Sequence, residues 1–144
     1  WRVIGPFPVG KTEYDADPVV ACGGLDAMLA NASAGCPSEL VDGGVAHWLT
    51  LRADGKTGGV QLGGWPNVRW QQLHQSMQSS IEAVEFQAWA VGTLRLGAAA
   101  RVAVHCAAVH SLSIDGVLLT GDVYTRELRS SIRLPAGEHR VRMR

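Results

Sequence analysis

Apolar and polar residues alternate in short stretches along much of the chain. The alternation is clear in VAHWLTLR, VEFQAWAVGTLRL, RVAVHC and VHSLSID, and again in the closing HRVRMR. A period of two places every second side chain on the same face of an extended strand. Seventeen glycines and six prolines separate these stretches, as turns between strands require. The pattern predicts an all-β fold, a jelly-roll-like antiparallel β-sandwich of about eight short strands.

Two turn signals refine this prediction. Asp115-Gly116 separates SLSI from VLL and predicts a hairpin, because glycine tolerates the positive φ of a tight turn. The tetrapeptide PAGE separates SSIRL from HRVRMR and predicts that these two segments pair as a last antiparallel hairpin. In HRVRMR, Val141 and Met143 are expected to point inward while the arginines between them face water.

The opening stretch, WRVIGPFPVG, predicts a strand over residues 2–4 that ends at Gly5-Pro6, because proline cannot donate a ladder hydrogen bond. Phe7 lies between two prolines and is predicted to fill the core outside the regular strand pattern. Asp17-Pro18 predicts the cap and first residue of a short helical turn that ends at a glycine pair. A second turn is predicted near residues 25–30, and PNVRWQQLHQSM also shows helical spacing.

Length and charge limit the classes of function. A chain of 144 residues fits a single domain, and because no methionine precedes Trp1 we expect a module excised from a longer chain. Thirteen basic and thirteen acidic residues give no net charge, which argues against a nucleic-acid partner. No apolar run reaches the roughly 18 residues of a membrane span, so no membrane partner is predicted. Localisation stays open, since a targeting segment would precede Trp1.

Three cysteines are an odd number without metal-ligand spacing. A disulfide framework is therefore not predicted, and whether Cys22 and Cys36 pair stays open. His105 and His110 flank Cys106, but their spacing puts them on opposite faces of an unbroken strand. We expect no metal site and no cofactor there.

The opening sequence WRVIGPFPVGKTEYDADPVVACGG resembles the start of the N-terminal β-sandwich module of prolyl-oligopeptidase-like α/β-hydrolase proteins. In that family a W-x-V-x-G-P-F-P strand leads into a T-E-x-D-x-D-P loop. The loop is matched here by Thr12, Glu13, Asp15, Asp17 and Pro18. WPNVRWQQL, WAVG, CAAVHSLSIDG, GDVY and LPAGEHRVRMR are similar to later parts of the same module. More distantly, the closing pattern resembles jelly-roll carbohydrate-binding modules.

The resemblance implies a role for the chain rather than a reaction. In such proteins the catalytic triad belongs to a separate downstream domain, and no Gly-x-Ser-x-Gly elbow is present here. We expect residues 1–144 to be a non-catalytic accessory module of a serine peptidase or esterase type of protein. Its expected partner is the downstream catalytic domain of the same polypeptide, which the module would pack against or gate. The alternative is a module that binds a glycan or a protein through exposed tryptophans.

Five tryptophans supply the candidate binding residues. Exposed indole faces can stack on sugar rings. Trp65 and Trp70 flank a segment with Asn67 outside the regular strand patterns, so these three residues form the predicted binding site. The other tryptophans lie in strand patterns and are expected in the core or in an interface. Packing remains the competing role for Trp65 and Trp70.

Two further sets of residues have the chemical types of a calcium site and of a hydrolytic triad. Asp15 and Asp17 are the candidate ligands for Ca²⁺, with capping of the following turn by Asp17 as the competing interpretation. Ser113, His110 and Asp115 have the residue types of a hydrolytic triad. Alternation puts His110 on the strand face opposite the other two, so no active site is predicted.

Overall fold

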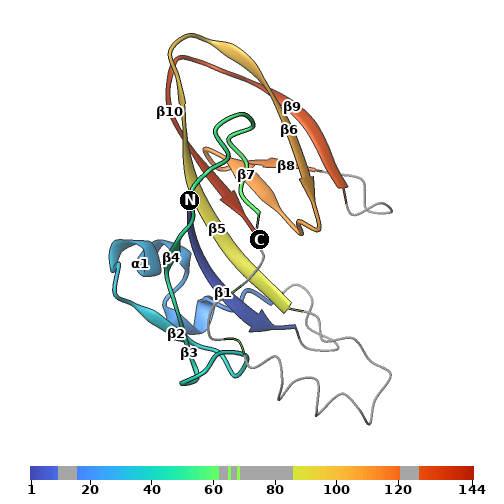
Figure 1. The fold of residues 1–144 in the computed structure, drawn as a ribbon. Coiled ribbons are helices and arrows are strands. Elements are labelled where there is room, and N and C mark those ends of the chain that lie inside the picture. The colour runs from blue at the N-terminus through green and yellow to red at the C-terminus, as the bar shows by residue number, and fades with distance from the viewer. Residues whose placement is uncertain (10–15, 62–64, 66–67, 69–85, 121–126) are drawn as a thin grey trace. The chain divides into compact units, whose positions relative to one another are not determined.

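The computed structural model describes residues 1–9, 16–61, 65, 68, 86–120 and 127–144 (Figure 1). Strands predominate among these residues, and the helices are two short turns. In chain order the elements are β1 (Arg2–Pro8), η1 (Val20–Cys22), α1 (Leu25–Ala30), β2 (Gly35–Pro37), β3 (Val45–His47), β4 (Leu49–Thr50), β5 (Phe86–Leu96), β6 (Ala100–Ala107), β7 (Leu112–Ile114), β8 (Val117–Leu119), β9 (Glu127–Leu134) and β10 (Gly137–Met143). The all-β prediction is confirmed.

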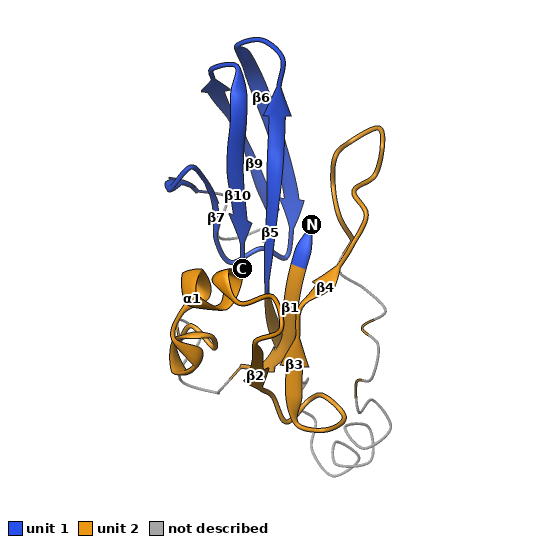
Figure 2. Ribbon diagram, turned by 90° about the vertical axis from the view of Figure 1, so that its left-hand side faces the viewer, with its two compact units in different colours: residues 1–2, 89–144 blue, residues 3–88 orange. Residues whose placement is uncertain are grey.

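The chain divides into two compact units, coloured separately in Figure 2. The C-terminal unit consists of Trp1–Arg2 and Trp89–Arg144. The N-terminal unit consists of Val3–Ala88. The boundary falls within β5, whose first three residues belong to the N-terminal unit and whose remainder belongs to the C-terminal unit.

The C-terminal unit is an antiparallel β-sandwich. One sheet has the order β5-β10-β7-β8, and the second sheet pairs β6 with β9. Both sheets contribute to one apolar cluster formed by Leu112, Ile114, Leu119, Leu128, Leu134 and Val141. Burying one such side chain contributes about 1.5–3 kcal/mol, so this shared core holds the two sheets together.

The predicted hairpin at Asp115-Gly116 is confirmed. β7 pairs with β8, with Ile114 opposite Val117. Asp115 and Gly116 adopt φ angles of 51° and 82°, the left-handed backbone that a two-residue hairpin turn requires. The turn chemistry alone therefore sufficed to locate this hairpin.

The predicted pairing of SSIRL with HRVRMR is wrong. β9 pairs with β6, whereas β10 pairs with β5 and β7, so the turn between β9 and β10 passes from one sheet to the other. β10 pairs with β5 along its whole length, from Gly137 opposite Leu96 to Met143 opposite Ala90. A turn signal marks where the chain reverses, and it does not specify which strand the next segment joins. Val141 is buried as predicted.

In the N-terminal unit β1 lies between β4 and β5. The prediction that the first strand ends at Gly5-Pro6 is wrong, because β1 continues to Pro8. Gly5 adopts a φ of 145°, and a Cβ there would lie 2.8 Å from the Cβ of Ala88. The close approach of β5 therefore requires glycine at this position. Phe7 is buried as predicted, with 1% of its surface exposed.

Both predicted helical turns of the N-terminal unit are present. Asp17 accepts a hydrogen bond at Oδ1 from the backbone N–H of Val19 at 3.1 Å, ahead of η1. Gly23 ends η1 in the left-handed conformation, and α1 follows. Cys22 and Cys36 form a disulfide with their Cα atoms 5.8 Å apart, which joins the end of η1 to β2. The alternating segment VAHWLTLR forms two short strands, β3 and β4, and one additional strand, β2, is too short for alternation to reveal.

Candidate functional site

The tryptophan site predicted from the sequence is described only at Trp65. Asn67 and Trp70 lie outside the described residues, as does most of the predicted helix around them. Trp65 is buried, with 8% of its surface exposed. Its indole N–H has no hydrogen-bond partner within the described part of the chain. This burial fits a packing role, since stacking on a sugar requires an exposed ring face.

The candidate calcium ligands are likewise only partly described. Asp15 lies outside the described residues, and Asp17 uses a carboxylate oxygen to accept the Val19 N–H. Among residues 1–9, 16–61, 65, 68, 86–120 and 127–144, no group of three or more His, Cys, Asp and Glu side chains is placed to hold a metal ion. The predicted cap is wrong in its position: η1 begins at Val20, its N-cap is Val19 without a side-chain cap bond, and Asp17 instead forms a local turn with the Val19 N–H ahead of it.

The residues of the imagined triad are not brought together. His110 accepts a hydrogen bond at Nδ1 from the guanidinium of Arg144 at 3.1 Å. Asp115 instead contacts His139, a residue that the sequence analysis did not select. Asp115 and His110 thus each contact a residue other than the members of the triad.

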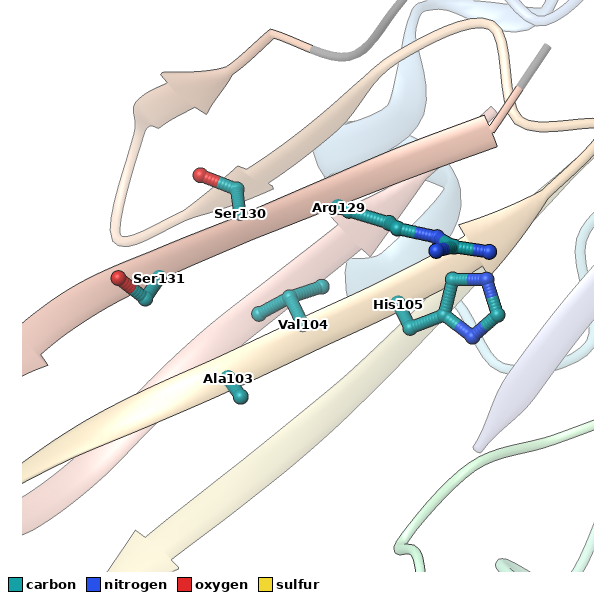
Figure 3. Close-up of a pocket in the computed structure, with 6 residues that line it drawn as sticks. All are labelled: Ala103, Val104, His105, Arg129, Ser130 and Ser131. Carbon is teal, nitrogen blue, oxygen red and sulfur yellow. The ribbon is translucent and has the colours of Figure 1, made fainter. Parts of the chain in front are cut away.

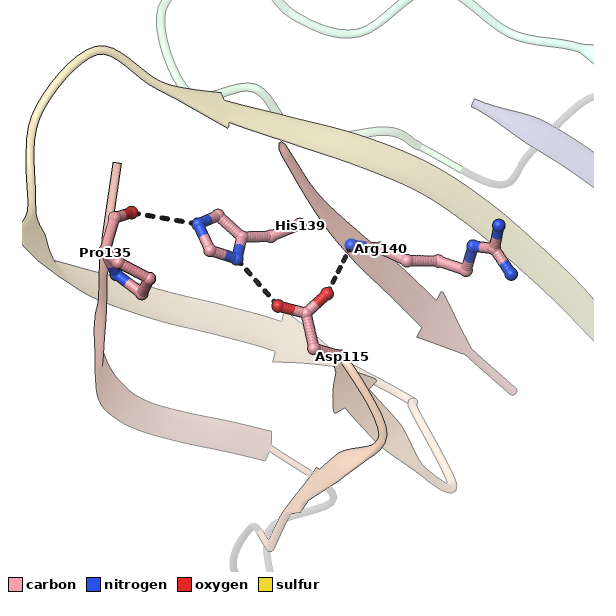
Figure 4. Close-up of polar contacts among 4 residues, drawn as sticks. All are labelled: Asp115, Pro135, His139 and Arg140. Carbon is pink, nitrogen blue, oxygen red and sulfur yellow. Dashed lines mark hydrogen bonds and ion pairs between the residues drawn. The ribbon is translucent and has the colours of Figure 1, made fainter. Parts of the chain in front are cut away.

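An ion pair between the buried His139 and the partly exposed Asp115 joins the β7–β8 hairpin to the start of β10 (Figure 4). The side chain of His139 is 5% exposed, and its Nδ1–H donates to Oδ2 of Asp115 at 2.7 Å. Its Nε2–H donates to the carbonyl oxygen of Pro135 at 3.0 Å. The second carboxylate oxygen of Asp115 accepts the backbone N–H of Arg140 at 2.7 Å. This network links the hairpin tip, β10 and the turn that precedes β10.

Both ring nitrogens of His139 face groups that can only accept a hydrogen bond. A carboxylate and a backbone carbonyl have no proton to donate, so the two bonds require the doubly protonated, positively charged imidazolium. The hydrogen bond to Asp115, followed by the Pro135 carbonyl, raises the pKa of His139 above its ordinary value. The same bond, followed by the Arg140 N–H, lowers the pKa of Asp115. The Asp115–His139 ion pair, which we call the charged clamp, therefore holds the β7–β8 hairpin against β10.

The sequence does contain a signal for this clamp. Alternation along β10 puts His139 on the same face as Val141, and Val141 is buried. A histidine on a buried face needs polar partners. The sequence alone did not show that the Asp115 turn, 24 residues away, supplies one of them.

The outer face of the β6–β9 sheet is the most distinctive surface of the C-terminal unit. We define this basic face by its outward side chains, which are the exposed residues Arg101, Ala103, His105, Arg129, Ser131 and Arg133, with the half-buried Glu127 at one end. The sheet register sets these residues opposite one another in pairs: Arg101 with Arg133, Ala103 with Ser131, and His105 with Arg129. The basic face thus has two cationic ends and a middle of small side chains.

A shallow depression lies along the same two strands (Figure 3). It is lined by Ala103, Val104, His105, Arg129, Ser130 and Ser131. At one end, Arg129 donates to Oε2 of Glu127 at 2.7 Å, and His105 Nε2 lies 3.8 Å from the same oxygen. Figure 3 shows the polar ends of His105 and Arg129 close together. The depression therefore presents cationic groups beside small, hydroxyl-bearing residues.

Charge is distributed very unevenly between the two units. The C-terminal unit contains nine arginines against four aspartates and glutamates, a formal charge of +5. The N-terminal unit contains four basic and nine acidic residues, a formal charge of −5. The zero net charge of the whole chain therefore conceals one strongly basic unit, and the prediction against a nucleic-acid partner rests on an average over both units.

Comparison with known proteins gives little further identification. No family model matches the chain, and no solved structure is a significant match. An uncharacterized secreted protein of Arthroderma benhamiae is 28% identical over 115 residues. The match covers 65% of this chain and 11% of that protein, so the chain spans only about a tenth of the length of the curated relative it matches. The resemblance to prolyl-oligopeptidase-like modules stays a prediction.

No helix in the described part of the chain has the length and apolar character needed to cross a membrane.

Proposed function

We propose that residues 1–144 are a non-catalytic accessory β-sandwich module of a longer secreted protein. The observation that carries this proposal is the share of the relative that is matched: the similar segment makes up 11% of a much longer chain. A segment of this size within a long chain is typical of one domain among several.

Two observations support secretion. The relative is described as a secreted protein. The Cys22–Cys36 disulfide requires an oxidising compartment, because cytosolic thiols are kept reduced.

The partner that we propose is a hydrolase domain of the same polypeptide, which the module packs against or gates. The support is the resemblance carried by WRVIGPFP and the T-E-x-D-x-D-P loop. The alternative of glycan binding through Trp65 receives less support, because that indole is buried.

A labelling experiment tests the non-catalytic role. Purified residues 1–144 are treated with a serine-directed fluorophosphonate probe and assayed with ester and peptide substrates, beside a known serine hydrolase as positive control. We expect neither labelling nor turnover. Stoichiometric labelling at one serine, with turnover that is lost when that serine is replaced by alanine, would contradict the proposal.

A further inference from the structure

The two cationic ends of the basic face are built differently. At one end Arg101 and Arg133 lie directly opposite each other across the β6–β9 pair. Directly opposed side chains have Cβ atoms about 4.5–5.5 Å apart, and like charges at that distance destabilise the sheet. Within the described part of the chain neither arginine forms an ion pair. The register thus sets two arginines opposite each other, and no ion pair to either is present among the described residues.

At the other end Glu127 forms an ion pair with Arg129, and His105 Nε2 lies 3.8 Å from the same carboxylate oxygen. The two ends are four residues apart along each strand, which corresponds to about 13 Å. The small side chains of Ala103 and Ser131 lie between the two ends and line the shallow depression. A single small anion could occupy only one end at a time. A chain with repeated anionic groups would engage both.

The side chains on the basic face also indicate what kind of polymer fits. Guanidinium groups bind carboxylates and sulfates through paired hydrogen bonds. The defined face has no Phe, Tyr, Trp or large apolar side chain, and protein interfaces rely on such residues as central anchors. Unpaired nucleic-acid bases would likewise need aromatic rings for stacking. The +5 charge of the C-terminal unit adds long-range attraction for a polyanion.

We propose that the outer face of the β6–β9 sheet binds a linear acidic polysaccharide. Arg101 and Arg133 bind one anionic group of the polymer, and Arg129 and His105 bind another. The choice of a polysaccharide over a nucleic acid rests on the proposed secreted location. Binding itself does not depend on the accessory role, so a failure of one proposal leaves the other standing.

The test measures affinity for defined polymers at several salt concentrations. The probes are polygalacturonate, which carries carboxylates, and dextran sulfate, which carries sulfates, with neutral dextran and a DNA duplex as comparisons. The test variant is Arg101→Ser with Arg133→Ser. The matched control is Arg52→Ser with Lys56→Ser, which removes the same charge from exposed residues of the N-terminal unit.

We expect the wild-type chain to bind at least one acidic polysaccharide and not neutral dextran. The Arg101/Arg133 variant should bind about five- to tenfold more weakly, the sum of two exposed ion pairs, while the control changes by less than about twofold. Glu127→Gln should strengthen binding about twofold or more, because it frees Arg129 from its protein partner. Thermal melts of every variant establish that each is folded. The carboxylate and sulfate probes identify which anionic group is preferred.

Three results would overturn the proposal. The first is no binding to either acidic polysaccharide at low salt. The second is equal weakening by the Arg101/Arg133 variant and its control, which would indicate attraction to net charge rather than to this face. The third is tighter binding of the DNA duplex than of both polysaccharides at the same salt, which would assign the face to nucleic acid.

Discussion

The two units of the chain differ both in charge and in how they are stabilised. The C-terminal unit is basic and consists of two sheets around a shared apolar cluster, with the Asp115–His139 ion pair between the β7–β8 hairpin and β10. The N-terminal unit is acidic and combines short elements with a disulfide and the buried Phe7. A chain with no net charge can therefore contain one strongly basic unit. The following predictions are ordered from the largest expected effect to the smallest.

The N-terminal unit should depend most on Phe7. We expect Phe7→Ala to lower the free energy of unfolding by about 3–5 kcal/mol, because the large cavity cannot close. Chemical denaturation measures the loss. Phe86→Ala provides an aromatic control in the same unit, and since Phe86 is 42% exposed it should cost much less. Equal losses for the two variants would show that burial of Phe7 does not dominate this unit.

The disulfide should be the second support of the N-terminal unit. Cys22 and Cys36 are 14 residues apart, and a closed loop of that length stabilises a fold by about 3 kcal/mol in the chain-entropy description. Dithiothreitol should lower the stability of the wild-type chain to that of Cys22→Ser/Cys36→Ser. The same reagent should leave the double variant unchanged. If reduction does not change the unfolding midpoint of the wild type, the disulfide has no such role.

The stability of the C-terminal unit should depend on pH through the Asp115–His139 pair. The pKa of His139 is raised on folding, so its stabilising contribution is complete below about 6.5 and is lost as pH rises through the raised value. The pKa of Asp115 is lowered, so its contribution is present above about 3.9 and is lost as pH falls through the lowered value. Stability from the pair is therefore greatest between these two limits.

Hydrogen exchange measured by mass spectrometry can assign this dependence to one unit. Peptides of β10 and of the β7–β8 hairpin should lose protection as pH rises above neutrality, after correction for the intrinsic exchange rate. His139→Gln should remove that dependence. His105→Gln serves as the control, because the His105 side chain is 62% exposed, and should leave it nearly intact. A pH profile unchanged by His139→Gln would refute the charged clamp.

The smallest expected effect concerns the opposed arginines of the basic face. Arg133→Glu converts a repulsive cross-strand pair with Arg101 into an attractive one. We expect stability to rise by about 0.2–1 kcal/mol. The gain should shrink in about 1 M salt, which screens exposed charges. Destabilisation at low salt would mean that the two guanidinium groups do not face each other as the register indicates.

Local chemistry could be predicted from the sequence, whereas long-range pairing could not. The hairpin at Asp115-Gly116 and the turn before Gly23 were found because the residues that determine them are adjacent in the chain. The partner strands of β10 and the bond between Asp115 and His139 depend on residues far apart in the sequence. Alternation specifies which face of a strand is buried, and not which strand lies beside it.

The candidate site shows the same limit. Counting charges over the whole chain hid the basic face, since its arginines come together only when β6 pairs with β9. The prediction based on Trp65, Asn67 and Trp70 rests on residue type and on a position outside the regular strand patterns, neither of which determines burial, and Trp65 is buried. The roles of Asn67 and Trp70 remain predictions, because both lie outside the described residues.

The accessory role is the central claim, and association with the rest of the parent protein tests it most directly. Residues 1–144 are titrated by calorimetry into a separately prepared remainder of the parent chain, and hydrolysis by that remainder is followed with and without the module. We predict saturable binding and a change in the rate or substrate range of hydrolysis when the module is bound. The claim would be contradicted if no association were detected and if the remainder hydrolysed its substrates equally well with and without the module.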